Sequence, residues 1–501
     1  MKPVPQQGAA HADDAVPVHL PQSQPDTGAR VAAKRSAPAQ RWAMASLSLT
    51  MLLAALGTSI ANVALPTLAQ VFGASFQQVQ WVVLAYLLAM TALVVSAGRI
   101  GDLIGRRRLM LAGIGLFTLA SVLCAIATTL WALIAARVVQ GLGAAIMMAL
   151  VMALVGGTVP KARTGGAMGL LGTMSAVGTA LGPSVGGALI ADFGWPSIFW
   201  LSLPLGALVF LLVRRNIAAD PPVVRTCDTR LDLPGTVLLS LTLVAYALAM
   251  TMGRGQYGSL NAVLLICALV GLGLFIRVET GAAAPLVRLS LFRQPALRAG
   301  VVTNVLVMTV MMATLVVGPF YLAQALLLDA ARIGLAMSFG PAVAALSGVP
   351  AGRMVDRLGA ERTTTAGLVA MLVGTCLLFL LPSSLGVPGY ILPLGIVTAG
   401  FAFFQAANNT AVMSDVRADQ RGVVSGLLTL SRNLGLITGA SAMGAVFALG
   451  SGLASGAIAA RPAAAVAGLR LTFLVAAGLV LLALAVGVMS RRCFGRESGG
   501  R

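Results

Sequence analysis

The sequence predicts an all-α protein that crosses a lipid bilayer many times. Of its 501 residues, 58% are hydrophobic and 10% are charged, which is more apolar surface than a water-soluble chain of this length could bury. Apolar runs of roughly 20 residues, enough for one helical span, recur from Met44 to Met489. These runs are continuous and contain glycine, so they favour helices over the short alternating strands of an outer-membrane barrel.

The chain begins with a polar segment and continues with fourteen apolar ones. Residues 1–41 are rich in Pro, Gln and Ala, and we expect them to form a disordered cytoplasmic tail rather than a signal peptide. The predicted spans are 44–66, 78–99, 109–128, 130–155, 166–190, 197–213, 233–252, 260–276, 299–322, 333–352, 364–382, 388–410, 422–447 and 468–489.

An internal repeat orders these spans. Residues 98–105 recur as 352–359, and the glycine pattern of 169–182 recurs in 426–439. Both shifts carry one span onto the eighth span after it, so we predict two parallel six-helix repeats separated by two inserted helices. The predicted regions are the tail 1–41, an N-terminal bundle 42–215, a linker with two extra helices 216–297, a C-terminal bundle 298–490 and a cytoplasmic tail 491–501.

The 34 Lys and Arg residues gather on one side of the predicted membrane. On these spans 28 of them lie on the side of the two termini, and only Arg254, Arg332, Arg461 and Arg470 lie on the other. Because basic residues accumulate in cytoplasmic loops, we expect both termini to be cytoplasmic in a cell inner (plasma) membrane. The net charge of +19 therefore indicates topology rather than nucleic-acid binding, and the basic segment 285–293 is expected to contact anionic lipid headgroups.

The sequence contains no catalytic or metal-binding pattern of the usual kinds. Its five cysteines are scattered without a CxxC pair, and both histidines, His11 and His19, lie in the N-terminal tail. We therefore predict no metal site, no cofactor and no enzymatic activity. A phosphate-binding loop is also absent from the sequence, so ATP-driven transport by this chain is not expected.

The repeated loop is a candidate gate. Its glycines let two helix ends approach closely, and the aspartate of each copy can pair with an arginine or with a helix N-terminus. Such a clasp would break when two halves of the protein rock; the alternative is an Arg-rich loop that only fixes topology. The gating candidates are Gly98, Asp102, Gly105, Arg106, Arg107, Gly352, Asp356 and Gly359.

Two further motifs lie inside predicted spans. Arg137 is followed three residues later by Gln140 on the same helix face. An arginine at membrane depth costs roughly 2.5–3.5 kcal/mol on insertion scales, so we expect it to face the bundle interior, either as a functional group or as a tie between helices. The next span carries glycines suited to tight packing and a proline suited to a kink; they are Gly178, Gly182, Pro183, Gly186 and Gly187.

These motifs resemble those of the major facilitator superfamily. Residues 98–108 are similar to its signature loop, 137–145 to a motif associated with proton transfer, and 178–187 to the antiporter motif of its exporters. Residues 56–66 resemble a signature of the fourteen-helix drug:proton antiporter branch. The resemblance implies the major facilitator fold, export of small molecules by alternating access, the proton as coupling ion and a monomer.

One position departs from that branch. An aspartate associated with proton coupling and cation recognition usually stands where this chain has Gly57. All 15 Asp and Glu residues lie in tails, in loops or at the ends of predicted spans. The coupling candidates are therefore Arg137, Gln140, Asp192, Asp102 or a titrating group of the substrate itself.

Polar residues of three spans are candidates for a substrate cavity. They are Asn62, Gln405, Asn408, Asn409, Arg432 and Asn433. With Arg137 and a wall formed by Met308, Met311 and Met312, they would favour neutral or anionic amphiphiles. In the alternative interpretation the methionines only pack or face lipid, and Arg432 only ties helices together.

The sequence therefore predicts a secondary active transporter that exports small amphiphilic molecules or drugs, with the proton as the expected coupling ion. Two alternatives stay open from the sequence. One is a uniporter or importer of a neutral or acidic metabolite. The other is a membrane sensor that has the same fold but does not transport.

Overall fold

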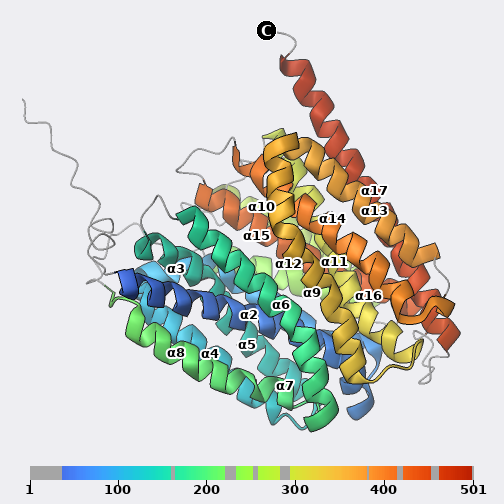
Figure 1. The fold of residues 1–501 in the computed structure, drawn as a ribbon, viewed down its shortest axis with the longest axis horizontal. Coiled ribbons are helices and arrows are strands. Elements are labelled where there is room, and N and C mark those ends of the chain that lie inside the picture. The colour runs from blue at the N-terminus through green and yellow to red at the C-terminus, as the bar shows by residue number, and fades with distance from the viewer. Residues whose placement is uncertain are drawn as a thin grey trace, which may run out of the picture.

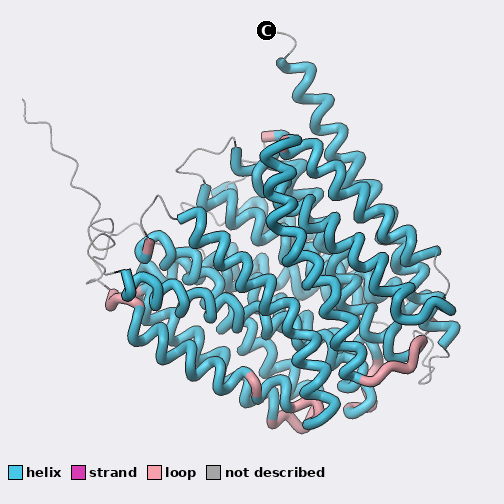
Figure 2. The backbone as a smooth tube through the Cα atoms, in the orientation of Figure 1, coloured by secondary structure: helices cyan, strands magenta, loops and turns pink. Residues whose placement is uncertain are grey.

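The computed structural model describes residues 37–159, 164–220, 233–251, 258–281, 294–380, 383–414, 421–452 and 462–498. In these ranges every regular element is a helix, and no strand occurs (Figure 2). The tail before residue 37 and the basic segment 285–293 lie outside the described residues. The first described helix begins at Ala37 and the last ends at Ser498, so residues 37–41 are helical although they were expected to be disordered, and residues 491–498 of the predicted C-terminal tail are helical too.

The helices of the first half follow one another with short connections. They are α2 (Ala37–Val71), α3 (Phe76–Ile104), α4 (Arg106–Ala125), α5 (Leu130–Thr158), α6 (Thr164–Phe193), the short α7 (Ser197–Trp200) and α8 (Ser202–Asn216). Two helices, α9 (Leu233–Thr251) and α10 (Ser259–Gly281), come next.

The second half repeats this order of helices. It consists of α11 (Pro295–Gln324), α12 (Ala330–Leu358), α13 (Ala360–Leu380), the 3₁₀ turn η3 (Ser383–Leu385), α14 (Gly386–Ser414), α15 (Arg421–Thr438), the π-helix η4 (Gly439–Met443), α16 (Gly444–Gly450) and α17 (Pro462–Ser498). In the described part of the chain, fourteen helical segments are long and apolar enough to cross a membrane. This confirms the predicted fold class and its number of spans.

Several helix starts are fixed by the side chain that precedes them. Ser75 accepts a hydrogen bond from the backbone N–H of Gln78, whose side chain in turn accepts one from the N–H of Ser75. Thr129 and Asp329 accept bonds from the third residue after them at the starts of α5 and α12. These caps satisfy backbone donors that have no partner inside the helix, so the sequence dictates where these spans begin.

Glycines hold corresponding helix pairs together in the two halves. A Cβ added to Gly143 of α5 would lie 2.7 Å from the backbone N of Phe117 in α4, and one added to Gly400 of α14 would lie 2.6 Å from the carbonyl oxygen of Gly367 in α13. The last glycines of the repeated loop also match, because Gly105 and Gly359 end α3 and α12 with φ of 102° and 82°. The sequence repeat is thus a structural repeat, and the two halves lie side by side (Figure 1).

Of the two inserted helices, α9 makes the main contacts with both halves. Helix α10 packs on α9, and α9 contacts α3 of the first half and η4 of the second. The hydroxyls of Ser96 in α3 and Thr236 in α9 are 2.8 Å apart. Large apolar side chains of α10, such as Ile266, Leu269 and Val270, are exposed on its outer surface, as expected for a lipid-facing helix.

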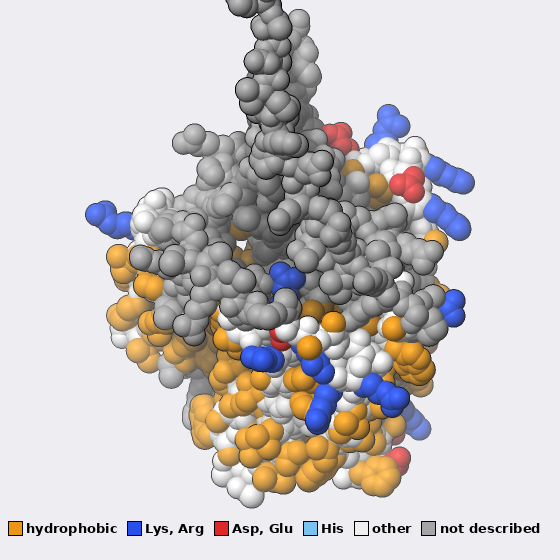
Figure 3. Space-filling model, turned by 90° about the vertical axis from the view of Figure 1, so that its left-hand side faces the viewer, with side chains coloured by type: hydrophobic (Ala, Val, Ile, Leu, Met, Phe, Trp, Pro, Cys, Tyr) orange, Lys and Arg blue, Asp and Glu red, His pale blue; other side chains and the backbone are white. Residues whose placement is uncertain are grey.

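The bundle has two different ends. We call the end that carries Arg106, Arg214 and Arg357 the basic end, and the end that carries Phe76 and Gly187 the closed end. Apart from Arg137 and Arg432, which lie inside apolar spans, the only described Arg residues toward the closed end are Arg332 and Arg470, near the starts of α12 and α17. Figure 3 shows Arg side chains spread over the face that it presents, with hydrophobic side chains covering much of its lower part.

Replacing Gly400 by Ala is expected to lower the free energy of unfolding by about 1–3 kcal/mol, because the added methyl group overlaps the backbone of α13. Gly478→Ala in α17 is the matched control, since nothing lies within 4 Å of a Cβ there. Thermal unfolding of the purified variants measures the difference. Equal unfolding temperatures for the two variants would contradict the glycine contact.

Candidate functional site

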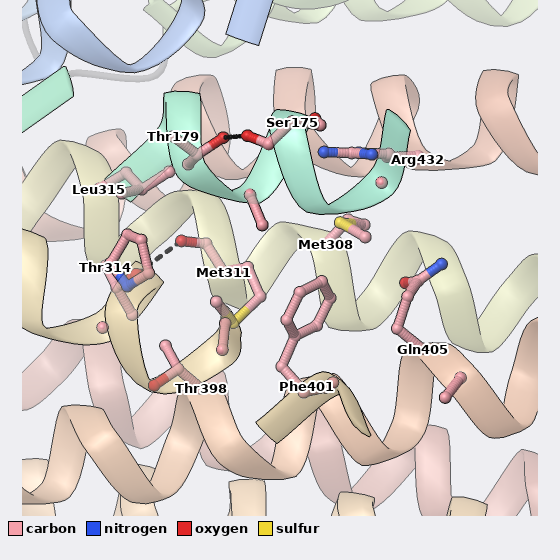
Figure 4. Close-up of a pocket in the computed structure, with 18 of the residues that line it drawn as sticks. Ser175, Thr179, Met308, Met311, Thr314, Leu315, Thr398, Phe401, Gln405 and Arg432 are labelled. Carbon is pink, nitrogen blue, oxygen red and sulfur yellow. Dashed lines mark hydrogen bonds between the residues drawn. The ribbon is translucent and has the colours of Figure 1, made fainter. Parts of the chain in front are cut away.

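A cavity of about 400 Å³ opens between α6 of the first half and four helices of the second. Figure 4 shows the side chains of Ser175, Met308, Phe401 and Arg432 around it. Its described lining is Gly172, Ser175, Ala176 and Thr179 of α6; Met308, Met311, Thr314 and Leu315 of α11; Met337, Gly340, Pro341, Ala344 and Gly348 of α12; Leu394, Thr398, Phe401, Ala402, Gln405, Ala406 and Asn409 of α14; and Arg432 of α15. A cavity of this size accommodates a drug-sized molecule.

The lining has an apolar wall and a polar end. Met308, Met311, Met337 and Phe401 form the apolar part, and thioether side chains adapt easily to ligands of different shape. At the polar end the amide of Gln405 donates a hydrogen bond of 3.1 Å to that of Asn409. Arg432 is the only charged residue among the lining residues that the structure describes.

The structure brings three of the six predicted cavity residues to this lining, namely Gln405, Asn409 and Arg432. Asn408 lies on another face of α14 and donates to the carbonyl of Gly300 at 3.3 Å, which ties α14 to α11. Asn62 and Asn433 are buried at 1% and 4% exposure and are not lining residues. The sequence could not separate these three residues from the lining residues, because hydropathy places a residue in depth but not around the helix axis.

The predicted methionine wall also lies only partly at the cavity. Met308 and Met311 line the cavity, whereas Met312 is buried against Gly439. Sequence reasoning missed the hydroxyl residues Ser175 and Thr179 on α6. Their spacing of four residues, which puts both on one helix face, was the available signal.

Arg137 lies outside the cavity and is completely buried. Its guanidinium donates hydrogen bonds to the carbonyl oxygens of Val82 at 2.9 Å and Gly57 at 3.2 Å, and to the side-chain oxygen of Gln140 at 2.5 Å. It also lies 4.2 Å from the centroid of the Tyr86 ring. The expectation that Arg137 lines the cavity is therefore wrong, because carbonyls of α2 and α3 enclose its head group.

Gln140 and Gly57 complete this cluster. The side chain of Gln140 donates to the hydroxyl of Ser121 at 2.7 Å, so the cluster joins α2, α3, α4 and α5. A Cβ on Gly57 would lie 2.6 Å from Cζ of Phe117. The Phe117 ring thus occupies the space into which the side chain of an aspartate at this position would extend.

The glycines of the α6 motif face two different partners. A Cβ on Gly178 would lie 2.6 Å from the carbonyl oxygen of Leu52, and one on Gly186 would lie 2.8 Å from Ile60, both in α2. Gly187 instead contacts the second half, where its Cβ would lie 2.9 Å from Cα of Gly334 in α12. Gly182 packs on Ser59, and the carbonyl of Pro183 packs on Gly334.

The two halves also meet at the closed end through aromatic and amide side chains. The ring centroid of Phe76 lies 4.5 Å from that of Phe320 and 5.3 Å from that of Phe447. Close by, the amide of Gln80 lies directly against Gly444. These aromatic and glycine contacts hold the two halves together at the closed end in the present conformation.

At the basic end the gating glycines do not meet the other half. Nothing lies within 4 Å of a Cβ on Gly98 or Gly352. The end of the loop is held within its own half, because Asp220, which follows α8, accepts hydrogen bonds from the backbone N–H of Arg107 at 2.8 Å and of Arg108 at 3.0 Å. Sequence reasoning missed Asp220, which caps the start of α4 in the way carboxylates favour.

The other gating and coupling candidates occupy the ends of helices. The guanidinium of Arg106 donates to the carbonyl of Ala153, and that of Arg107 to the carbonyl of Arg214. Asp356 is exposed at the end of α12, and Asp192 is exposed near the end of α6. Asp102 belongs to α3, but its side chain lies outside the described residues.

Comparison with known proteins identifies the class. Residues 47–440 match the Major Facilitator Superfamily. The drug efflux pump JefA of Mycobacterium tuberculosis is 33% identical over 424 residues, which cover 83% of this chain and 82% of that protein. The riboflavin transporter RibZ of Clostridioides difficile is 30% identical over 410 residues, covering 82% of this chain and 89% of the relative.

A solved structure shares the fold. A bacterial homologue of the human lysosomal transporter Spinster, in an inward-facing and unoccupied conformation, matches with a TM-score of 0.66 and 15% identity, covering 92% of this chain and 99% of that one. The chain belongs to the Major Facilitator Superfamily. It is a multi-pass membrane transporter of small molecules and not an enzyme.

Restoring the aspartate with Gly57→Asp is expected to destabilise the protein, because the new side chain overlaps Phe117. Phe117→Ala alone should cost about 3–5 kcal/mol, as for other buried aromatic residues. The double variant should unfold at a higher temperature than additivity predicts, since each change relieves the other. Strict additivity in the thermal unfolding of the four proteins would disprove the overlap.

Gly187→Val is expected to separate the closed ends of α6 and α12, because its side chain overlaps the backbone at Gly334. Spin labels on cysteines at the exposed positions Asp192 and Arg332, in a background without other cysteines, report this separation by pulsed electron paramagnetic resonance. Gly172→Val, whose Cβ has no neighbour within 4 Å, is the control. An unchanged distance distribution in Gly187→Val would rule out a close contact between the halves there.

Proposed function

We propose that the protein is a secondary active transporter that exports small amphiphilic molecules or drugs by alternating access. The observation that carries this proposal is the cavity, which lies between α6 and the second half and beside contacts that seal one end of the bundle. Such a cavity suits a substrate site from which the two halves rock apart in turn. The similarity to JefA, named as a drug efflux pump, supports the direction of transport.

The proposal includes a topology. Residues 42–215 and 298–490 would be the two moving bundles, with 216–297 between them. The basic end, with Arg106, Arg214 and Arg357, would face the cytoplasm, which places both termini there in a cell inner membrane. The cavity would then be sealed from the outside in the present conformation, and a monomer surrounded by lipid would suffice for transport.

Proton antiport is the proposed energy source. Arg137 donates to Gln140 and to backbone carbonyls, and Gln140 donates to Ser121, so the candidates that can exchange protons are Asp192, Asp102 or the substrate itself. The repeated loop and the Gly187 contact would act as the two gates, one at each end of the bundle.

Export can be tested in cells that lack their own efflux pumps. Cells that express the chain should accumulate less of an amphiphilic dye than cells without it, and a protonophore should abolish the difference while the membrane potential is clamped. Gly478→Ala, which changes an exposed glycine, should export like the unchanged protein. Export that is indifferent to the pH gradient would reject proton coupling but keep transport; equal accumulation in all cells would reject export.

A second candidate is a uniporter or importer of a neutral or acidic metabolite. The similarity to RibZ, named as a riboflavin transporter, favours it. Vesicles of both orientations distinguish the two candidates, because an antiporter driven by protons moves substrate uphill in one direction only, whereas a uniporter equilibrates it from either side.

A further inference from the structure

Arg432 is the feature that the fold itself leaves unexplained. It lies within the apolar span Leu427–Gly450 of the second half, yet its side chain is exposed to the cavity. No hydrogen bond or ion pair joins it to any residue that the structure describes. Charged residues at membrane depth are costly and are normally paired, and among the described residues this guanidinium has no such partner.

The other arginine at membrane depth, Arg137, has hydrogen-bond partners that Arg432 does not have among the described residues. Arg137 is enclosed by carbonyl oxygens, an amide oxygen and an aromatic ring, and it has no access to the cavity. Arg432 makes none of these contacts with the described residues and does not tie α15 to another helix. The neighbouring Ser431 makes such a tie instead, since its hydroxyl accepts a bond of 2.7 Å from Asn304 of α11.

The described lining of the cavity offers Arg432 no negative charge. None of its described lining residues is an Asp or Glu. The described acids on α6, α12 and α13 lie at helix ends, at Asp192, Asp329, Asp356 and Glu361. Asp415 and Asp419, between α14 and α15, lie outside the described residues. A positive charge without a facing carboxylate repels cations and attracts anions.

The groups around Arg432 suit the head of an anionic ligand. Ser175 of α6 lies on the same side of the cavity as Arg432 in Figure 4, and it corresponds to Arg432 in the sequence repeat of 169–182 and 426–439. The amides of Gln405 and Asn409 lie on α14. A carboxylate or sulfonate could accept bonds from the guanidinium in a two-point arrangement, with a hydroxyl nearby as a further donor.

The remainder of the cavity suits an apolar body. Met308, Met311, Met337 and Phe401 are its larger apolar lining residues, and sulfur and aromatic groups both pack well on flat rings. We propose that the cavity binds amphiphilic monoanions, with the carboxylate or sulfonate on Arg432 and an aromatic or aliphatic body against the methionines. This inference rests on the proposed function and names its substrate class.

Three probes with one naphthyl body test the inference: 4-(1-naphthyl)butyrate, its neutral amide and the matched trimethylammonium cation. Isothermal titration calorimetry with the purified protein measures their binding. The butyrate should bind most tightly and the cation most weakly. Arg432→Gln should weaken the butyrate at least ~10-fold, as expected when one partner of a close charge pair is removed, and leave the amide unchanged.

Two further variants complete the test. Arg432→Lys keeps the charge but loses the two-point geometry, so it should retain part of the preference for the butyrate. Arg332→Gln removes an exposed arginine that pairs with Asp329 at 3.6 Å at the closed end, and it should bind all three probes like the unchanged protein. The preference among probes is measured on the unchanged protein, so the test stands even where Arg432→Gln fails to fold.

The outcomes separate this inference from the proposed function. A cation or amide that binds as tightly as the butyrate would overturn the inference, as would an Arg432→Gln variant that folds and binds the butyrate unchanged. If the cation is also exported by cells that express the chain, the proposed export stands without the anion preference. If the butyrate binds through Arg432 but no probe crosses the membrane of vesicles, the site stands and the export function fails.

Discussion

Backbone contact at glycine is the interaction on which the rest of this structure depends. In lipid, apolar side chains gain little by leaving their surroundings for a helix interface, so close packing at small residues has to hold helices together. Gly143 and Gly400 do this inside each half. Gly187 and Gly334 make the same kind of contact between the halves. A contact of small backbone surfaces is strong when closed and leaves no large apolar side chain stranded when open, which suits an interface that has to separate.

The two halves are alike in framework and different in chemistry. Gly178 and Gly182 pack on α2 as Gly435 and Gly439 pack on α11. The position after the second glycine differs, with Pro183 inside α6 and Ala440 inside the π-helix η4. Helix α6 continues through Pro183, whereas the second half changes from an α-helix to a π-helix at the equivalent place. The cavity is equally unsymmetrical, because Ser175 stands where the repeat has Arg432.

The sequence predicted the fold well because its signals are local. Apolar length, the placement of arginine and the repeat of 98–105 at 352–359 are all visible along the chain, and each has a direct structural consequence. The cavity was predicted only in part. Gln405 and Asn408 lie three residues apart, yet one lines the cavity and the other binds Gly300. Which face of α14 meets the cavity depends on how α14 packs against α11 and α12, and a single span does not contain that information.

Position 57 shows the same limit of prediction from sequence. The resemblance implies an aspartate where this chain has Gly57, but only the structure shows that Phe117 lies in the space beside Gly57 and that the carbonyl oxygen of Gly57 accepts a bond from Arg137. The charge that lines the cavity comes from the second half, at Arg432.

For an anionic substrate this arrangement has an energetic consequence. Moving one negative charge out of a cell whose interior is negative is favoured by about 2.3 kcal/mol per 100 mV of membrane potential. A cation would have to be exported against the same potential. In the drug:proton antiporter branch that the sequence resembles, an aspartate is associated with proton coupling and cation recognition. On the proposed assignment the potential itself assists export, so proton exchange would add to the driving force without being its only source. A cavity whose described lining has an arginine and no acid is consistent with the export of an anion.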